Sequence, residues 1–162
     1  MANLAQREEA SLYERDFCAW TEEQVRILKT GDYTHLDIEN VVEELESLGR
    51  SEQRELCSRL EVLLAHLLKW SYEAKRHSRS WENSIDDQRE RIQLVFKSSP
   101  SLRGRLGSTL VDAYRLARRT AGNEMNLEKR EWDALFPQSC PWHAAQVLDE
   151  DFYPAPASPA EE

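Results

Sequence analysis

A row of carboxylates on one predicted helix is the first feature of this sequence with the residue types for chemistry. Glu39, Glu43, Glu46 and Arg50 fall at i, i+4, i+7 and i+11, so they line one side of a helix. Like charges at this spacing destabilise a helix by about 0.2–0.5 kcal/mol per pair, which favours a partner such as a metal ion, a basic helix or another protein. The interpretation we favour is that the carboxylates face solvent, with Arg50 and Arg54 as their counterions.

His66 is the second candidate, because it lies at the edge of an apolar helical stripe beside Leu63 and Trp70. A lone histidine there is more often a hydrogen-bonded boundary residue than a ligand. The sequence contains no Glu-x-x-His, so the spacing excludes a ferritin-like di-iron site. We expect no cofactor, and a site for one divalent metal ion remains the weaker alternative. Its candidate ligands are Asp37, Glu43, Glu46 and His66.

Basic and aromatic side chains alternate between residues 69 and 81. Such a pattern binds nucleic acid through phosphate contacts and base stacking. The chain as a whole is acidic, with a pI near 5.0, whereas a nucleic-acid-binding domain usually has a basic excess. We therefore rank nucleic acid third among the possible partners. The residues of this patch are Lys69, Trp70, Tyr72, Lys75, Arg76, His77, Arg79 and Trp81.

If these features meet in a pocket, we expect it between a helix over residues 37–48 and the end of a helix over 51–72. The candidate lining residues are Glu39, Glu43, His66, Lys69, Trp70, Arg79 and Trp81. We assign no catalytic residue, since the sequence has no G-x-S-x-G, G-x-G-x-x-G or G-x-x-x-x-G-K-[ST] motif. Cys140 and His143 have the spacing of half a zinc site, but no second clustered pair completes it, so loop packing is favoured.

Composition limits the class of protein. The 162 residues are 40% hydrophobic and 31% charged with a net charge of −9, which fits one globular domain. No apolar run approaches the roughly 18 residues that cross a bilayer, and the first residues contain no apolar secretory core. The three cysteines are widely spaced, as expected in a reducing compartment. These features predict a cytoplasmic protein without a membrane partner.

Helical periodicity runs through almost the whole chain. Thr21 and Gln24 resemble a capping box that starts a short helix ending at Gly31. Asp37 is the next predicted cap, and Gly49 is predicted to end or kink the helix that follows it. The apolar positions of that helix are Ile38, Val41, Val42, Leu45 and Leu48.

Ser51 is predicted to cap the most apolar helix, which continues to Tyr72. Ser80 is the predicted cap of the next helix, and Ser99 with Pro100 marks the start of another that reaches Gly122. Residues 124–140 are predicted to be irregular, anchored by Trp132, Leu135 and Phe136, and a short helix follows within 141–148. The fold class is therefore all-α, an antiparallel bundle of about four longer helices with short flanking helices. We expect an N-terminal extension (1–12), one helical domain (13–154) and a disordered Pro/Ala-rich tail (155–162).

Several of these segments resemble a known family. The motifs that carry the resemblance are DFCAW at 16–20, LDIENVVEELESLGR at 36–50, LLAHLLKW at 63–70, RSW at 79–81, FP at 136–137, CP at 140–141 and DEDFYP at 149–154. They are similar to the bacterial family catalogued as domain of unknown function number 29, over about residues 13–154. The resemblance implies an all-helical cytoplasmic bacterial protein. That family has no assigned activity, so no mechanism is implied.

Charge is segregated along the chain. Residues 1–60 carry 14 acidic and 7 basic side chains, residues 61–130 carry 9 and 14, and residues 131–162 carry 7 and none. Together with a very apolar central helix, five tryptophans and no catalytic motif, this favours a non-catalytic helical-bundle interaction module. We expect it to self-associate or to bind a partner protein. The alternatives are a metal-binding bundle or metal-dependent enzyme using His66 with carboxylates of residues 37–46, and nucleic-acid binding through residues 69–79.

Overall fold

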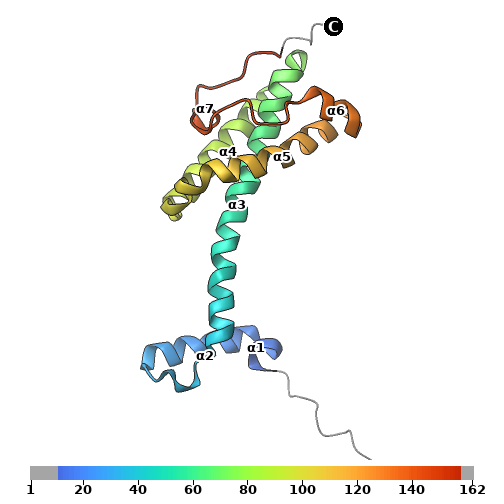
Figure 1. Ribbon diagram of the computed structural model, residues 1–162. Helices are drawn as coiled ribbons and strands as arrows, with labels where there is room; N and C mark the ends of the chain where they lie inside the picture. The colour runs from blue at the N-terminus through green and yellow to red at the C-terminus, as the bar shows by residue number, and fades with distance from the viewer. Residues whose placement is uncertain (1–10, 158–162) are drawn as a thin grey trace, which may run out of the picture. The chain divides into compact units, whose positions relative to one another are not determined.

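The computed structural model describes residues 11–157, and within this range it contains helices and no strand. The predicted all-α class and helical-bundle architecture are confirmed. None of the helices within residues 11–157 is both long and apolar enough to cross a membrane. The elements are α1 (Leu12–Arg15), α2 (Phe17–Thr30), η1 (Tyr33–His35), α3 (Ile38–Tyr72), η2 (Ala74–Arg76), α4 (Arg79–Ser98), η3 (Pro100–Arg105), α5 (Leu106–Glu124), α6 (Lys129–Leu135) and α7 (Ala144–Leu148) (Figure 1).

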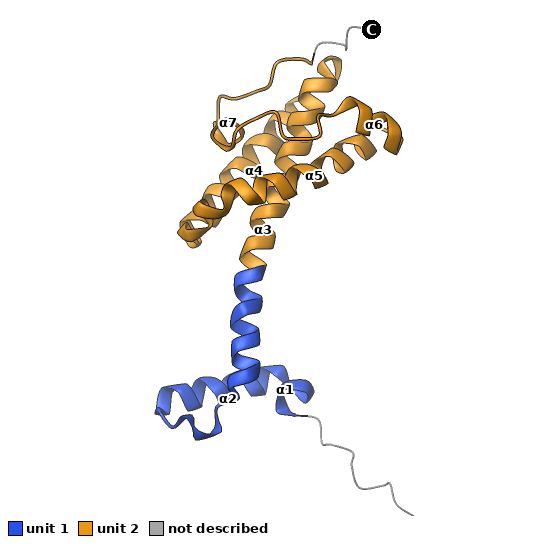
Figure 2. Cartoon of the chain, in the orientation of Figure 1, with its two compact units in different colours: residues 1–50 blue, residues 51–162 orange. Residues whose placement is uncertain are grey.

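The chain divides into two compact units, residues 1–50 and residues 51–162 (Figure 2). The sequence analysis predicted one domain over 13–154. Of the predicted N-terminal extension (1–12) and the predicted disordered tail (155–162), residues 1–10 and 158–162 lie outside the described residues. Within the predicted tail, the amide of Ala157 donates to the carbonyl of Ser71, and the Ser71 hydroxyl donates to the carbonyl of Ala155.

Unit 1 contains α1, α2, η1 and the first part of α3. The Asp16 carboxylate accepts from the amide of Ala19 and so caps α2, which begins four residues before the predicted cap. The Thr21 prediction is therefore wrong, and its hydroxyl donates to the carbonyl of Phe17 inside the helix. The predicted end of α2 is confirmed, because Gly31 has a left-handed backbone with φ 75°.

The helix α3 runs without interruption from Ile38 to Tyr72. The predicted helix end at Gly49 and the predicted cap at Ser51 are therefore wrong. A glycine that stops a helix usually adopts a left-handed backbone, and among residues 11–157 only Gly31 and Asn126 have positive φ. Gly49 instead occupies an ordinary helical position between segments of good helix formers, where glycine costs only about 1 kcal/mol.

Unit 2 is a helical bundle in which α3, α4 and α5 share one apolar core (Figure 1). Side-chain hydrogen bonds join Gln53 to Arg105, Glu61 to Thr120 and Lys69 to Glu124. These contacts advance in the same direction along both segments, so α5 runs in the same sense as α3, which it crosses at an angle (Figure 1). The core residues are Leu56, Leu60, Leu63, Leu64, Leu67, Leu68, Ile85, Ile92, Phe96, Leu110, Tyr114, Phe136 and Val147.

Two buried arginines hold the irregular C-terminal part of unit 2 against these helices. The guanidinium of Arg89, on α4, donates to the carbonyls of Val147, Glu150 and Phe152 at 2.6–3.1 Å. On α5, the guanidinium of Arg118 donates to the carbonyl of Phe136. Burial lowers the pKa of Arg89, and each backbone carbonyl it meets replaces a water that burial removed.

The remaining helix boundaries shift by small amounts. Ser78 caps α4, two residues before the predicted cap, and Pro100 starts a 3₁₀ helix that leads into α5. Residues 124–140, predicted to be irregular, contain α6. Phe136 is buried as predicted, whereas Leu135 is 41% exposed, so its predicted role as an anchor is wrong.

The helical backbone at Gly49 predicts opposite effects for two glycine substitutions. We expect Gly49→Ala to stabilise the protein by about 0.5–1 kcal/mol, because it adds helix propensity where an added Cβ has nothing within 4 Å. The matched control, Gly31→Ala, should destabilise it by about 1 kcal/mol, because a side chain is strained at φ 75°. Urea unfolding followed by circular dichroism measures both. Destabilisation by Gly49→Ala would contradict a continuous helix.

Candidate functional site

The residues of the predicted pocket fall in two groups. Glu39 and Glu43 lie on α3 within unit 1, whereas His66, Lys69, Trp70, Arg79 and Trp81 lie in unit 2. The pocket prediction required residues 37–48 and 51–72 to be two helices that pack antiparallel. That premise is wrong, since both segments belong to α3. Within unit 2, the structure places the ammonium of Lys69 over the ring of Trp81.

Lys69 is the most buried member of that group. Its side chain is almost fully buried, its ammonium donates to the carboxylate of Glu124, and it lies 4.8 Å from the ring centre of Trp81. The ion pair and the aromatic face together compensate for removing the ammonium from water. Lys69 therefore acts within unit 2, and its charge does not contribute to an exposed basic patch.

His66 occupies the half-buried boundary position that the helical wheel favoured. Its Nδ1 lies 2.9 Å from the carbonyl oxygen of Val62, one turn earlier. Burial lowers the pKa of His66, the Val62 carbonyl opposes this shift, and the nearby ammonium of Lys69 adds to it. The imidazole is consequently neutral at pH 7, with one nitrogen committed to the helix backbone.

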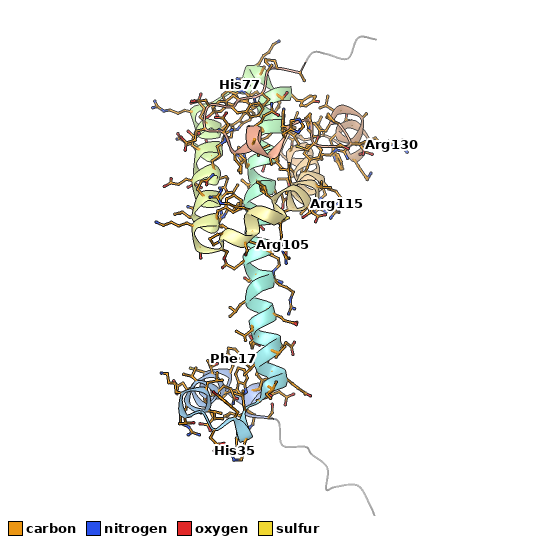
Figure 3. The ribbon with its side chains drawn as sticks, turned by 60° about the vertical axis from the view of Figure 1, so that its left-hand side comes forward. Phe17, His35, His77, Arg105, Arg115 and Arg130 are labelled. Atoms are coloured by element: carbon orange, nitrogen blue, oxygen red, sulfur yellow. The ribbon has the colours of Figure 1, made fainter. Side chains whose placement is uncertain are left out.

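The aromatic residues of the predicted nucleic-acid patch make intramolecular contacts. Trp70 stacks on His77 with ring centres 3.8 Å apart, and Tyr153 lies 4.8 Å from Trp70 on the C-terminal segment. The His77 label in Figure 3 marks this end of unit 2. A ring that already stacks inside the fold offers one face fewer to a base.

Two of the carboxylates proposed as metal ligands, Asp37 and Glu46, have partners within unit 1. Within residues 11–157, no group of three or more His, Cys, Asp or Glu side chains is arranged to hold a metal ion. Glu46 forms an ion pair with Arg50 at 3.3 Å. Asp37 accepts hydrogen bonds from Trp20 and Asn40, so its oxygens are already occupied.

Asp37 joins the segments of unit 1. Its carboxylate accepts from the indole N–H of Trp20 at 3.0 Å and from the amide of Asn40 at 3.3 Å, the second bond capping α3. Its own amide donates to the side-chain oxygen of Gln24 at 2.9 Å. Hydrogen bonds from Asn40, and then from Trp20, lower the pKa of Asp37. One carboxylate thus fixes where α2 lies against the start of α3.

An aromatic cluster lies beside this network. The ring of Trp20 has centre distances of 4.8 Å to Tyr13 and 5.5 Å to Phe17, which Figure 3 labels. The hydroxyl of Tyr13 donates to the carboxylate of Glu44 on α3. This hydrogen bond raises the pKa of Tyr13 to about 12, with burial and the charge of Glu44 adding to the shift. Together with Asp37, the cluster attaches one side of α3 to α1 and α2.

The next side of α3 in unit 1 is apolar and exposed. Ile38, Val42, Leu45 and Leu48 are 60%, 48%, 63% and 64% exposed, and they follow one another at intervals of three or four residues. We call these four residues the apolar row. Residues at this spacing lie on one side of a helix. The apolar row lies next to the side that meets α1 and α2, and within residues 11–50 its four side chains stay exposed.

An acidic row of Glu39, Glu43 and Glu46 lies beyond the apolar row around the same helix. The described residues of unit 1 include ten acidic and four basic side chains. Neither Glu39 nor Glu43 forms a salt bridge within residues 11–157. Two neighbouring surfaces, one apolar and one anionic, therefore face solvent on one helix.

Two cavities in unit 2 are each lined in part by a group that already has a hydrogen-bond partner. One, of about 530 Å³, includes Arg89, whose guanidinium binds backbone carbonyls. The other, of about 380 Å³, includes Tyr114 and Cys140. The hydroxyl of Tyr114 donates to the Pro137 carbonyl, and burial raises the pKa of the Cys140 thiol, so this thiol is protonated at neutral pH.

Comparison with known families gives one match that spans most of the chain. Residues 12–153 match the family described as Domain of unknown function DUF29. The chain belongs to the DUF29 family. The resemblance found from the motif residues is therefore confirmed over nearly the same range. No curated protein and no solved structure matches the chain. Since DUF29 is defined without an activity, the functional argument rests on the geometry.

The apolar row is the feature that sequence reasoning missed. The sequence predicts the helical spacing of these apolar positions but not their exposure. The five tryptophans were offered as possible interface anchors, yet Trp20 is 5% exposed and the other four are half-buried. The sequence feature that indicates this exposure is the carboxylate row beside the apolar positions, because a row of like charges next to an apolar row favours a partner.

Removing the Asp37 carboxylate should loosen unit 1 without affecting unit 2. We expect Asp37→Ala to destabilise unit 1 by about 1–2 kcal/mol, because the cap of α3 and the Trp20 hydrogen bond are lost. Hydrogen exchange should accelerate in residues 17–30 and stay unchanged in 85–96, and Glu39→Ala is the control. The lowered pKa of Asp37 means that its contribution is present above pH 3.8 and is lost as the folded-state carboxyl protonates. Equal exchange in both variants would contradict this role.

Proposed function

We propose that this DUF29 protein is a non-catalytic interaction module whose unit 1 binds a different protein. One observation carries the proposal. Among residues 11–157, twelve large apolar side chains are exposed, and nine of them lie between Leu12 and Leu48. Apolar side chains gathered on one small unit mark an interaction surface more often than the same number scattered over a protein.

The energetic argument concerns the apolar row. Fully burying a side chain such as Leu45 contributes about 1.5–3 kcal/mol, and residues 11–50 leave about half or more of this burial unmade at four neighbouring positions. Unit 2 has no comparable need, since Leu56, Leu60 and Leu63 are fully buried. A partner that covers the apolar row supplies what α4, α5 and the C-terminal segment supply in unit 2.

The contacts of the polar groups described in unit 2 support a non-catalytic role. Lys69 is paired with Glu124, the pKa of Cys140 is raised, and Tyr114 donates to a backbone carbonyl. Catalytic groups usually combine a shifted pKa with an accessible position beside a cavity and a partner that activates them. The polar groups described above are instead used to hold unit 2 together.

A photo-crosslinking amino acid at position 45 tests the proposal in the source cells. We expect one adduct with a different protein at position 45 and none at position 94, because Leu94 is 56% exposed but lies on α4 in unit 2. The adduct must form again from the two purified proteins and disappear with Ile38→Asp.

Two results would overturn the proposal. Equal labelling from positions 45 and 94 would mean that unit 1 has no special surface. An adduct that contains only two copies of this chain would replace a second protein with self-association.

A further inference from the structure

We infer that the partner binds unit 1 with an amphipathic helix that carries basic side chains beside its apolar stripe. The inference rests on the proposed function and adds the chemistry of the partner. It uses two properties of α3 within unit 1: the shape of the apolar row and the charge of the acidic row next to it.

The shape of the apolar row fits a helix. Ile38 and Leu48 are ten residues apart, so the row extends about 15 Å along the helix axis. Its members project at intervals of three or four residues, and such a ridge packs between the ridges of a second helix. About three turns of a partner helix would cover the row. α1 and α2 leave this side of α3 open, since all four side chains are at least 48% exposed.

The acidic row selects a basic partner. Glu39 and Glu43 are at i, i+4, and Glu43 and Glu46 are at i, i+3, so each carboxylate repels its neighbour. Within residues 11–157, only Glu46 of these three has an ion pair, with Arg50. Lysine or arginine side chains beside the apolar stripe of a docked helix reach this row while the apolar side chains meet. Their positive charge converts the repulsion into attraction.

A second copy of unit 1 fits this surface less well than a basic helix. Two copies would bring together acidic rows of the same sign, in units with ten acidic and four basic described side chains each. Like charges placed opposite one another oppose association and suppress a wrong partner. Charge complementarity therefore favours a different, basic protein segment over self-association.

A synthetic peptide of leucine and lysine, about 14 residues long and amphipathic as a helix, is the probe for the full chain. One control peptide keeps the leucines and replaces lysine by glutamate, and a second has the lysine peptide's composition in scrambled order. Fluorescence anisotropy gives Kd at low and at physiological salt. We expect the lysine peptide to bind at least about tenfold more tightly than either control, and more weakly as salt rises.

Variants of the full chain separate the two rows. Glu39→Gln with Glu43→Gln should weaken binding by about three- to tenfold and reduce its salt dependence, because two charges without salt bridges within residues 11–157 are removed. Glu82→Gln with Glu90→Gln is the matched control on α4, with the same change in net charge, and should leave Kd unchanged. Leu45→Asp should weaken binding by more than about tenfold, whereas Leu94→Asp should not.

Equal binding of the lysine and scrambled peptides would overturn the inference, because it would show non-specific attraction to an acidic protein. Equal effects of the two glutamine pairs would overturn it as well. The proposed function has a separate test: a cross-link from position 45 to a different protein would stand after either result. That partner would then lack a basic amphipathic helix.

Discussion

Leucine side chains on α3 are stabilising only where another part of the protein removes them from water. In unit 2, Leu56, Leu60, Leu63, Leu64 and Leu67 are completely buried, since α4, α5 and the C-terminal segment surround them. In unit 1, α1 and α2 are short and cover one side of α3 only. The apolar row keeps about half or more of its surface exposed, and the two units differ chiefly in this respect.

Charged side chains hold segments together by hydrogen bonds in both units, but with different partners. Arg89 and Arg118 are 2% and 6% exposed, and their guanidiniums bind backbone carbonyls that no helix or strand would otherwise satisfy. A segment with little regular structure can therefore cover a core. In unit 1, the Asp37 carboxylate joins α2 to the start of α3 through Trp20 and Asn40. The acidic row differs from these groups, because within residues 11–157 only Glu46 of its three carboxylates forms an ion pair.

Local signals predicted the helices well where one residue settles the backbone. Asp37 caps α3, Gly31 ends α2, and the motif residues gave the family. The predicted helix end at Gly49 is wrong, because glycine ends one helix in a left-handed conformation at Gly31 but continues α3 in an ordinary helical conformation at Gly49. The sequence predicted neither the burial of Arg89 nor the exposure of the apolar row, for a shared reason. Their burial or exposure depends on segments distant in the sequence. The apolar residues around Leu45 repeat at the same helical spacing as those around Leu63, so the spacing does not distinguish the two units.

Solvent access to the leucine methyl groups tests the central claim most directly, since it needs no partner. A soluble paramagnetic gadolinium chelate broadens the NMR signals of methyl groups that water reaches. In the free full chain, we predict strong broadening for Leu45 and Leu48 and weak broadening for Leu63 and Leu64, which are fully buried. Leu45 methyl groups as protected as those of Leu63 would show that the row is already covered, and would contradict an open binding surface on unit 1.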